Sequence, residues 1–179
     1  VEPLLADKPE HIVPRPQPAA FMDNGFGFKM AIPENQYNLG ELYNLSIRKG
    51  TLSPEDRFKI NEHIIQTIIM LAKLDFPEYL QQVPEFAGAH HETMDGTGYP
   101  RGLRKEEMSV QARIIAIADI FEALTAADRP YKTPKTVNEA LGIMSRMRDD
   151  AHIDADLFDR FLEGRVYEKY ARQYLAPEQ

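Results

Sequence analysis

The stretch VQARIIAIADIFEALTA, residues 110–126, decides the fold, because it predicts a helix that is apolar almost all round. Between Ile114 and Leu124 only Asp119 and Glu122 are polar. A helix without a broad polar face is typical of the centre of a larger assembly. We therefore expect this helix to be central, with further helices packed around it.

A long helix is predicted from Ser53 to about Phe76-Pro77. Ser53 is a suitable N-cap and Pro54 suits the first helical position, while the later proline ends the pattern. Four apolar residues recur at helical spacing and predict one buried stripe: Ile60, Ile64, Ile68 and Leu71. His63 lies beside this stripe.

Shorter helices are predicted towards the C-terminus. Thr136 with Glu139 forms a capping box, Asp154 caps a further helix that Gly164 stops, and a last helix covers about 166–174. No strand-like alternation of useful length and no internal repeat occurs. The predicted fold is all-α, a compact helical bundle with an irregular N-terminal segment.

The N-terminal segment differs from the remainder in composition. Residues 1–38 contain six prolines and no sustained helical or strand period, so we interpret them as a linker or wrapping segment. Residues 39–179 form the predicted helical domain.

Composition limits the function classes. The 179 residues carry a net charge of -7 and no cysteine, which argues against binding long nucleic acid and excludes a thiolate metal site. No apolar stretch is long enough to span a membrane, so we expect no membrane contact and a cytoplasmic protein. A local basic cluster could bind a small anion or could be an ordinary solvated surface; its residues are Arg101, Arg104, Lys105, Arg129, Lys132 and Lys135.

The sharpest chemical feature is the run of His90, His91, Glu92 and Asp95 before a glycine-rich loop. A second helix is expected to end near His91, and adjacent histidines on a helix point about 100° apart. The pair could therefore bind two neighbouring metals, or one metal from two sides. Taken without context, the pair is better explained as one core and one exposed histidine.

Two further residues could join a metal site. His63 alone is typical of a hydrogen-bonded core histidine. Asp119 lies in the apolar helix, where a carboxylate is costly unless it binds a metal or pairs with an arginine such as Arg113 or Arg129. Together these imidazoles and the carboxylate suit iron, manganese or zinc, and two such metals can activate water and polarise a phosphodiester.

The segment HHETMDGTGYP, residues 90–100, resembles the signature HHExxDGxGYP of the HD-GYP family at every specified position. Three other segments resemble further landmarks of the family in the same order: GTLSPED at 50–56, ARIIAIAD at 112–119 and DRPYK at 128–132. The resemblance covers about residues 39–165 and is highly specific.

The resemblance implies a helical HD-type metallophosphodiesterase of bacterial signalling that opens cyclic di-GMP to pGpG and often GMP. It implies two or three divalent ions, with iron or manganese favoured. The implied metal ligands are His63, His90, His91 and Asp119, and the implied substrate contacts are Arg129 and Lys132. The implied loop, which shapes the site or contacts a partner such as a diguanylate cyclase, comprises Asp95, Gly96, Gly98, Tyr99 and Pro100.

The sequence departs from the family in one respect, because it contains no His-Asp dipeptide. We expect the chain to be a fragment of a longer signalling protein that carries this pair upstream. The alternatives are a catalytically silent module that binds cyclic di-GMP or a partner protein, and a phosphohydrolase for another nucleotide.

Overall fold

The structure is a computed structural model that describes residues 5–16, 25–127 and 134–179. Contacts divide the chain into two compact units, Val1–Lys73 and Leu74–Gln179. This division differs from the predicted boundary at residue 38, which stays a prediction. Seven α-helices and one two-stranded sheet occur among the described residues, and the predicted all-α class is confirmed.

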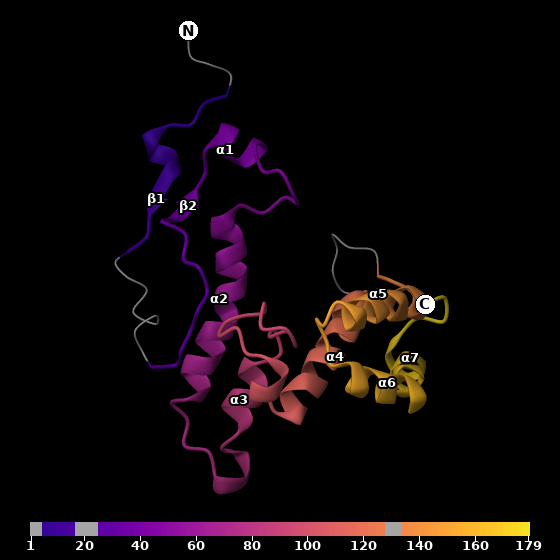
Figure 1. Cartoon of the computed structure of the whole chain (residues 1–179). Helices are drawn as coiled ribbons and strands as arrows, with labels where there is room; N and C mark the ends of the chain where they lie inside the picture. Colours follow the sequence, from indigo (N-terminus) through magenta and orange to yellow (C-terminus); the bar gives the residue numbers. More distant parts are fainter. Residues whose placement is uncertain (1–4, 17–24, 128–133) are drawn as a thin grey trace. The chain divides into compact units, whose positions relative to one another are not determined.

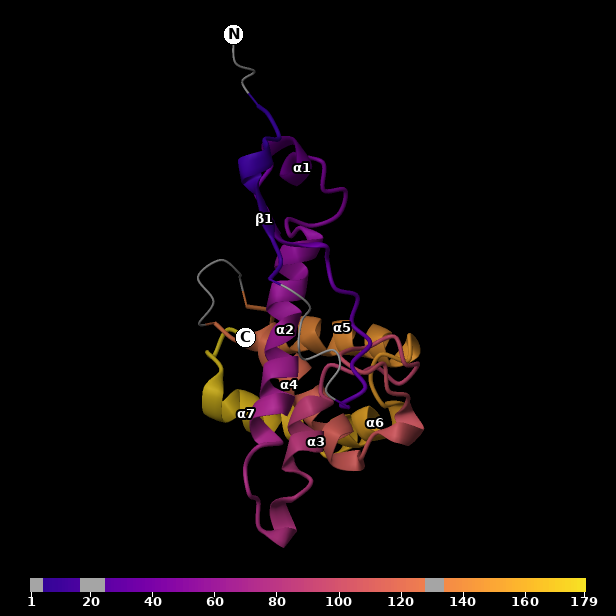
Figure 2. The same cartoon turned by 90° about the vertical axis from the view of Figure 1, so that its left-hand side faces the viewer.

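The first unit combines a short ribbon with two helices. Strands β1 (Ile12–Pro14) and β2 (Asn35–Asn38) pair in antiparallel fashion, α1 covers Glu41–Leu45 and α2 covers Pro54–Leu71. The ribbon lies beside the N-terminal part of α2 (Figures 1 and 2), which β2 contacts. The sequence did not predict these strands, because segments of three and four residues are too short to show alternation.

Arg15 attaches the proline-rich segment to α2. Its guanidinium donates to the carbonyls of Pro33 at 3.1 Å and Asn35 at 3.0 Å, and it lies 4.7 Å from the centroid of the Phe58 ring. A cation over an aromatic face is attractive. This part of the segment therefore packs on α2.

Helix α2 begins where the sequence predicts. The Ser53 hydroxyl accepts a hydrogen bond from the Asp56 amide at 3.1 Å, and the Asp56 carboxylate accepts from the Ser53 amide. The buried stripe is only partly correct: Ile64 and Ile68 are buried, but Ile60 is 54% exposed. Ile65 is buried in addition, because the buried face is rotated from the 60–64–68 line.

The second unit is built around α4. Its helices are α3 (Val83–Gly88), α4 (Val110–Thr125), α5 (Val137–Asp149), α6 (Ala155–Glu163) and α7 (Val166–Tyr174). Helix α4 contacts α3, α5 and α6 (Figure 1), which confirms its expected central position. One hydrophobic core cluster of this unit consists of Ile117, Phe121, Ala140, Met144, Ile153 and Phe158.

Helix α4 is central but is not buried on all sides. Ile114, Ala118, Asp119 and Glu122 are exposed and lie at helical spacing on one face. The apolar residues Ile114 and Ala118 made this face look buried in the sequence.

The later caps agree with the sequence. Thr136 and Glu139 form the predicted capping box of α5, and α6 begins after Asp154 and ends at Gly164. Helix α7 covers the predicted range. These boundaries depend on local side-chain to backbone bonds, which sequence patterns report directly.

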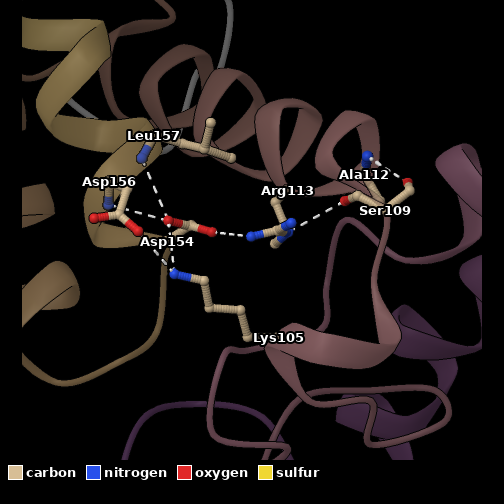
Figure 3. Close-up of polar contacts among 7 residues, drawn as sticks. All are labelled: Lys105, Ser109, Ala112, Arg113, Asp154, Asp156 and Leu157. Carbon is tan, nitrogen blue, oxygen red and sulfur yellow. Dashed lines mark hydrogen bonds and ion pairs between the residues drawn. The ribbon is translucent and has the colours of Figure 1, made fainter.

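Asp154 is also the centre of a polar network (Figure 3). Its side chain, 1% exposed, accepts from the amides of Asp156 at 3.0 Å and Leu157 at 3.3 Å. It also pairs with Arg113 of α4, and with Lys105 at 3.3 Å. Burial by itself raises the pKa of Asp154, but the bonds from Leu157, Arg113 and Lys105 outweigh it and hold the pKa below its ordinary value. One carboxylate therefore connects α4, α6 and the short 3-10 helix Lys105–Glu107.

Among the described residues, no helix combines the length and the apolar character that crossing a membrane requires.

Candidate metal centre

The histidine pair lies just beyond α3 rather than on a helix. The helix ends at Gly88, and His90 and His91 follow in a turn. Their ring centroids are 4.2 Å apart, and each offers a ligand nitrogen within 4.8 Å of the other. Because the pair follows α3 instead of lying on it, the 100° spacing of adjacent helical residues does not apply to these two histidines. Both imidazoles can reach one small region.

His90 is oriented by a backbone hydrogen bond. Its Nδ1 lies 2.7 Å from the carbonyl oxygen of Ala87. In the tautomer that donates this bond, Nε2 carries the lone pair. Histidine ligands typically donate their other ring nitrogen in this way, because the bond fixes the ring and raises its basicity. The arrangement suits a metal ligand.

His63 repeats this arrangement in the first unit. It is exposed on α2, and its Nδ1 lies 2.7 Å from the Ile60 carbonyl oxygen. The interpretation of His63 as a buried core histidine is therefore wrong. Because His63 belongs to the other unit, its membership of one centre with His90 and His91 stays a prediction.

Asp119 is exposed on α4, so the argument from a costly buried carboxylate does not apply to it. The alternative pairing with Arg113 is also wrong, because Arg113 is bonded to Asp154 and to the Ser109 carbonyl. Asp119 lies close enough to Tyr99 for its charge to contribute to that residue's pKa: burial raises the pKa of Tyr99, and Asp119 raises it further. Asp119 therefore belongs to the same neighbourhood as the glycine-rich loop.

Tyr99 connects that loop to the histidine pair. Its ring stacks on the His91 ring with centroids 4.9 Å apart and planes at 20°. Its amide donates to the His91 carbonyl at 3.2 Å. The second unit thus brings His90, His91 and Tyr99 together, with Asp119 near them.

Asp95 shapes the tip of the loop. Its Oδ1 accepts from the Thr93 hydroxyl at 2.6 Å, the Thr97 amide at 3.0 Å and the Thr97 hydroxyl at 2.8 Å. These bonds lower the pKa of Asp95 to about 2. An aspartate that accepts from the backbone two residues on is typical of a tight turn. Asp95 and Thr97 are exposed, whereas Pro100 is buried.

Two glycines are required by this geometry. Gly96 has a φ of +83°, and a Cβ there would lie 2.9 Å from Cγ of Arg104. A Cβ on Gly98 would lie 2.4 Å from the Thr93 nitrogen and 2.5 Å from the Glu92 Cα. The loop therefore crosses directly over the backbone that follows His91.

Glu92 is a residue to which the sequence assigned no separate role. It is 2% exposed and accepts from the amides of Arg101 at 2.7 Å and Leu103 at 2.8 Å. Burial raises the pKa of Glu92, and these two backbone bonds oppose the rise. The signal in the sequence was a carboxylate placed immediately before a loop rich in glycine, whose amides need acceptors.

The predicted substrate contacts, Arg129 and Lys132, lie outside the described residues.

Comparison with known proteins identifies the class. A family model described as an HD domain matches residues 1–157, and the chain belongs to this family. The match includes the whole N-terminal segment that we interpreted as a linker.

Several curated relatives share parts of the sequence. A 3'3'-cGAMP-specific phosphodiesterase 1 of Vibrio cholerae is 48% identical over 43% of this chain and 18% of its own length. A cyclic di-GMP phosphodiesterase of Thermotoga maritima is 39% identical over 52% of this chain and 25% of its own. A probable cyclic di-GMP phosphodiesterase of Vibrio cholerae is 31% identical over 75% of this chain and 31% of its own length. The chain thus spans less than a third of each of these proteins.

Proposed function

We propose that the protein is a metal-dependent phosphodiesterase that hydrolyses cyclic di-GMP to pGpG and GMP. The observation that carries the proposal is the position of His90 and His91, with ligand nitrogens within 4.8 Å, directly before the loop 95–100. The names of the relatives support the same chemistry.

The residues present fit a divalent metal. We propose that His63, His90, His91 and Asp119 hold the ions, because imidazole and carboxylate ligands together suit iron, manganese or zinc. The bond from the His90 ring to Ala87 supports this assignment. Bound ions would lower the pKa of a water molecule and polarise the phosphodiester. Two or three ions, with iron or manganese favoured, are part of the proposal.

The substrate is proposed to be cyclic di-GMP, and 3'3'-cGAMP is a second candidate. Relatives that are named for each of these cyclic dinucleotides match this chain, at 39% and 48% identity respectively. Both molecules contain two phosphodiester bonds in a ring, so the same hydrolytic step applies to either. A direct comparison of the two cleavage rates decides between them.

Arg129 and Lys132 are proposed to contact the phosphate or the guanine of the substrate. A guanidinium can pair with a phosphate through two hydrogen bonds but cannot ligate a cation. Arg129→Ala should therefore weaken nucleotide binding far more than Mn²⁺ binding, both measured by calorimetry. Equal loss of both would contradict this assignment.

Contact with a signalling partner such as a diguanylate cyclase is proposed to involve the loop tip. Asp95 and Thr97 are exposed there, whereas Tyr99 is half-buried and Pro100 is buried. Asp95→Lys should then weaken binding of a purified diguanylate cyclase without loss of Mn²⁺ affinity. Unchanged cyclase binding would remove the loop tip from the proposal.

The proposal is tested by product analysis on two chains. Four candidate ligands can hold one metal, or two poorly, and the His-Asp pair would supply a bridging carboxylate. The 179 residues alone should therefore show little hydrolysis with Mn²⁺ or Fe²⁺, whereas a longer chain with an upstream His-Asp pair should produce pGpG.

Two outcomes oppose the proposal. Robust turnover by the 179 residues that survives His63→Ala and His91→Ala would contradict the ligands and the mechanism. Nucleotide binding without hydrolysis in the longer chain would favour the silent binding module.

A further inference from the structure

Glu92 is a buried carboxylate whose two oxygens both accept from the backbone of another segment. One oxygen accepts from the Arg101 amide at 2.7 Å, and the other accepts from the Leu103 amide at 2.8 Å. Each carboxylate oxygen can accept hydrogen bonds, so the two oxygens of one side chain suit two converging amides. Glu92 therefore holds residues 101–103 in place.

These bonds close a loop that begins and ends at Glu92. The chain leaves Glu92, crosses back over it at Gly98, where a Cβ would lie 2.5 Å from the Glu92 Cα, and then reaches Leu103. Within this loop Tyr99 donates to the His91 carbonyl and stacks on the His91 ring. The position of the Tyr99 ring thus depends on the segment that Glu92 holds.

The loop has further attachments that do not involve Glu92. The Met94 amide donates to the Ala151 carbonyl at 3.0 Å, and the Lys105 amide donates to the Met94 carbonyl at 3.2 Å. Met94 and Leu103 also pack on the buried cluster of Ala89, Met108 and Ala112. Loss of the Glu92 bonds should therefore change the loop locally rather than unfold the unit.

We propose that Glu92 is a positioning residue, which holds the 101–103 backbone so that Tyr99 keeps the His91 imidazole oriented for a metal. This inference rests on the proposed function, because it takes His91 to be a ligand. Glu92 touches neither the metal nor the substrate in this account. It acts on His91 through Tyr99.

A purely structural role would also keep a buried acid at this position. An apolar residue at 92 would leave the Arg101 and Leu103 amides without acceptors, which is costly in a buried place. A structural role changes stability alone. A positioning role changes metal affinity at constant fold, because removing a group that orients a ligand typically costs 10-fold to 100-fold in affinity.

The first test is Glu92→Gln, which preserves the size of the side chain. Its amide nitrogen would face one of the two backbone amides, so one hydrogen bond becomes a contact between two donors. We expect faster hydrogen exchange at the Arg101 and Leu103 amides by NMR, and Mn²⁺ affinity about 10-fold weaker or more by calorimetry. Glu106→Gln is the matched control, because Glu106 is exposed, and it should change neither measurement.

A second variant covers the case in which Glu92→Gln does not fold. Tyr99→Leu removes the ring that stacks on His91 but leaves Glu92 unchanged. It should weaken Mn²⁺ binding in the same direction, and Tyr99→Phe, which keeps a ring, should weaken it less.

The outcomes separate the two proposals. Faster exchange at Arg101 and Leu103 with unchanged Mn²⁺ affinity would overturn the positioning role alone. Unchanged affinity in Tyr99→Leu would do the same. A wild-type chain that binds no Mn²⁺ would overturn the metal centre, and the positioning role with it.

Discussion

Asp154→Asn should destabilise the second unit only because the negative charge of Asp154 is lost. Asparagine is as good an N-cap as aspartate and fits the same space, so the start of α6 is retained. The variant loses the negative charge that Arg113 and Lys105 approach. The loss of stability in this variant therefore measures the contribution of the ion pairs in Figure 3, separately from that of the helix cap.

The exposures of the partners set the expected magnitude. Removing one partner of a fully buried pair costs about 3–5 kcal/mol. The Asp154 side chain is 1% exposed, but those of Arg113 and Lys105 are 15% and 36% exposed and can partly regain water. We therefore expect a loss of about 2–3 kcal/mol in the free energy of unfolding. With an m-value of about 1.5 kcal/mol/M, the urea midpoint falls by about 1.3–2 M.

The contribution of the Asp154 charge to stability should decrease at low pH. The pKa of Asp154 is lowered from 3.8 in the folded protein, so its contribution is complete above the unfolded pKa. It is lost as pH falls through the lower folded pKa. The difference in stability between wild type and Asp154→Asn should therefore be full at pH 7 and shrink below about pH 4.

Urea unfolding followed by circular dichroism tests both points. Asp149→Asn is the control, because Asp149 pairs with Arg148 at the surface and such pairs contribute about 0–1 kcal/mol. A midpoint for Asp154→Asn that equals wild type at pH 7 would refute the reasoning. A difference that stays constant down to pH 3 would refute the assignment to the Asp154 charge.

Two further predictions concern the site. Gly98→Ala should lower the free energy of unfolding in urea by about 1–3 kcal/mol, because the new Cβ meets backbone atoms of Glu92 and Thr93. The control Gly142→Ala, whose Cβ meets nothing within 4 Å, should be neutral or stabilising. Equal stabilities of the two variants would contradict the close approach at Gly98. Asp119→Asn should lower the Mn²⁺ content by elemental analysis and change stability by less than about 0.5 kcal/mol, since Asp119 is exposed; full metal content would remove Asp119 from the ligands.

Much of the helical fold could be predicted from the sequence, because its signals are local. Ser53, Thr136 and Asp154 each cap a helix through a bond to an amide two or three residues on. Gly164 ends α6 as expected. These interactions lie within four residues, so the order of residue types reveals them.

What depends on the packing of distant segments could not be predicted in this way. Ile60 and Ile114 have the spacing of buried residues and are exposed, because spacing gives the apolar faces of a helix but not which of them are covered. The helix before the histidine pair was expected to end near His91, whereas α3 ends at Gly88.

The candidate site shows the same division. The histidines and the loop were visible as a motif, whereas the hydrogen bonds that Glu92 accepts from the Arg101 and Leu103 amides join residues nine and eleven positions apart. The role of Asp119 was argued from burial that the structure does not have. The prediction that Asp119 is a metal ligand is now supported by its position near Tyr99 instead.

The most direct test of the proposed metal-dependent phosphodiesterase is removal and return of the metal in a longer chain with an upstream His-Asp pair. After treatment with EDTA, conversion of cyclic di-GMP to pGpG is followed by anion-exchange chromatography as Mn²⁺ or Fe²⁺ is added. We predict that the metal restores cleavage in the wild type and fails to restore it in His90→Ala and His91→Ala. Cleavage that persists in EDTA, or that returns fully in either histidine variant, would contradict the central claim.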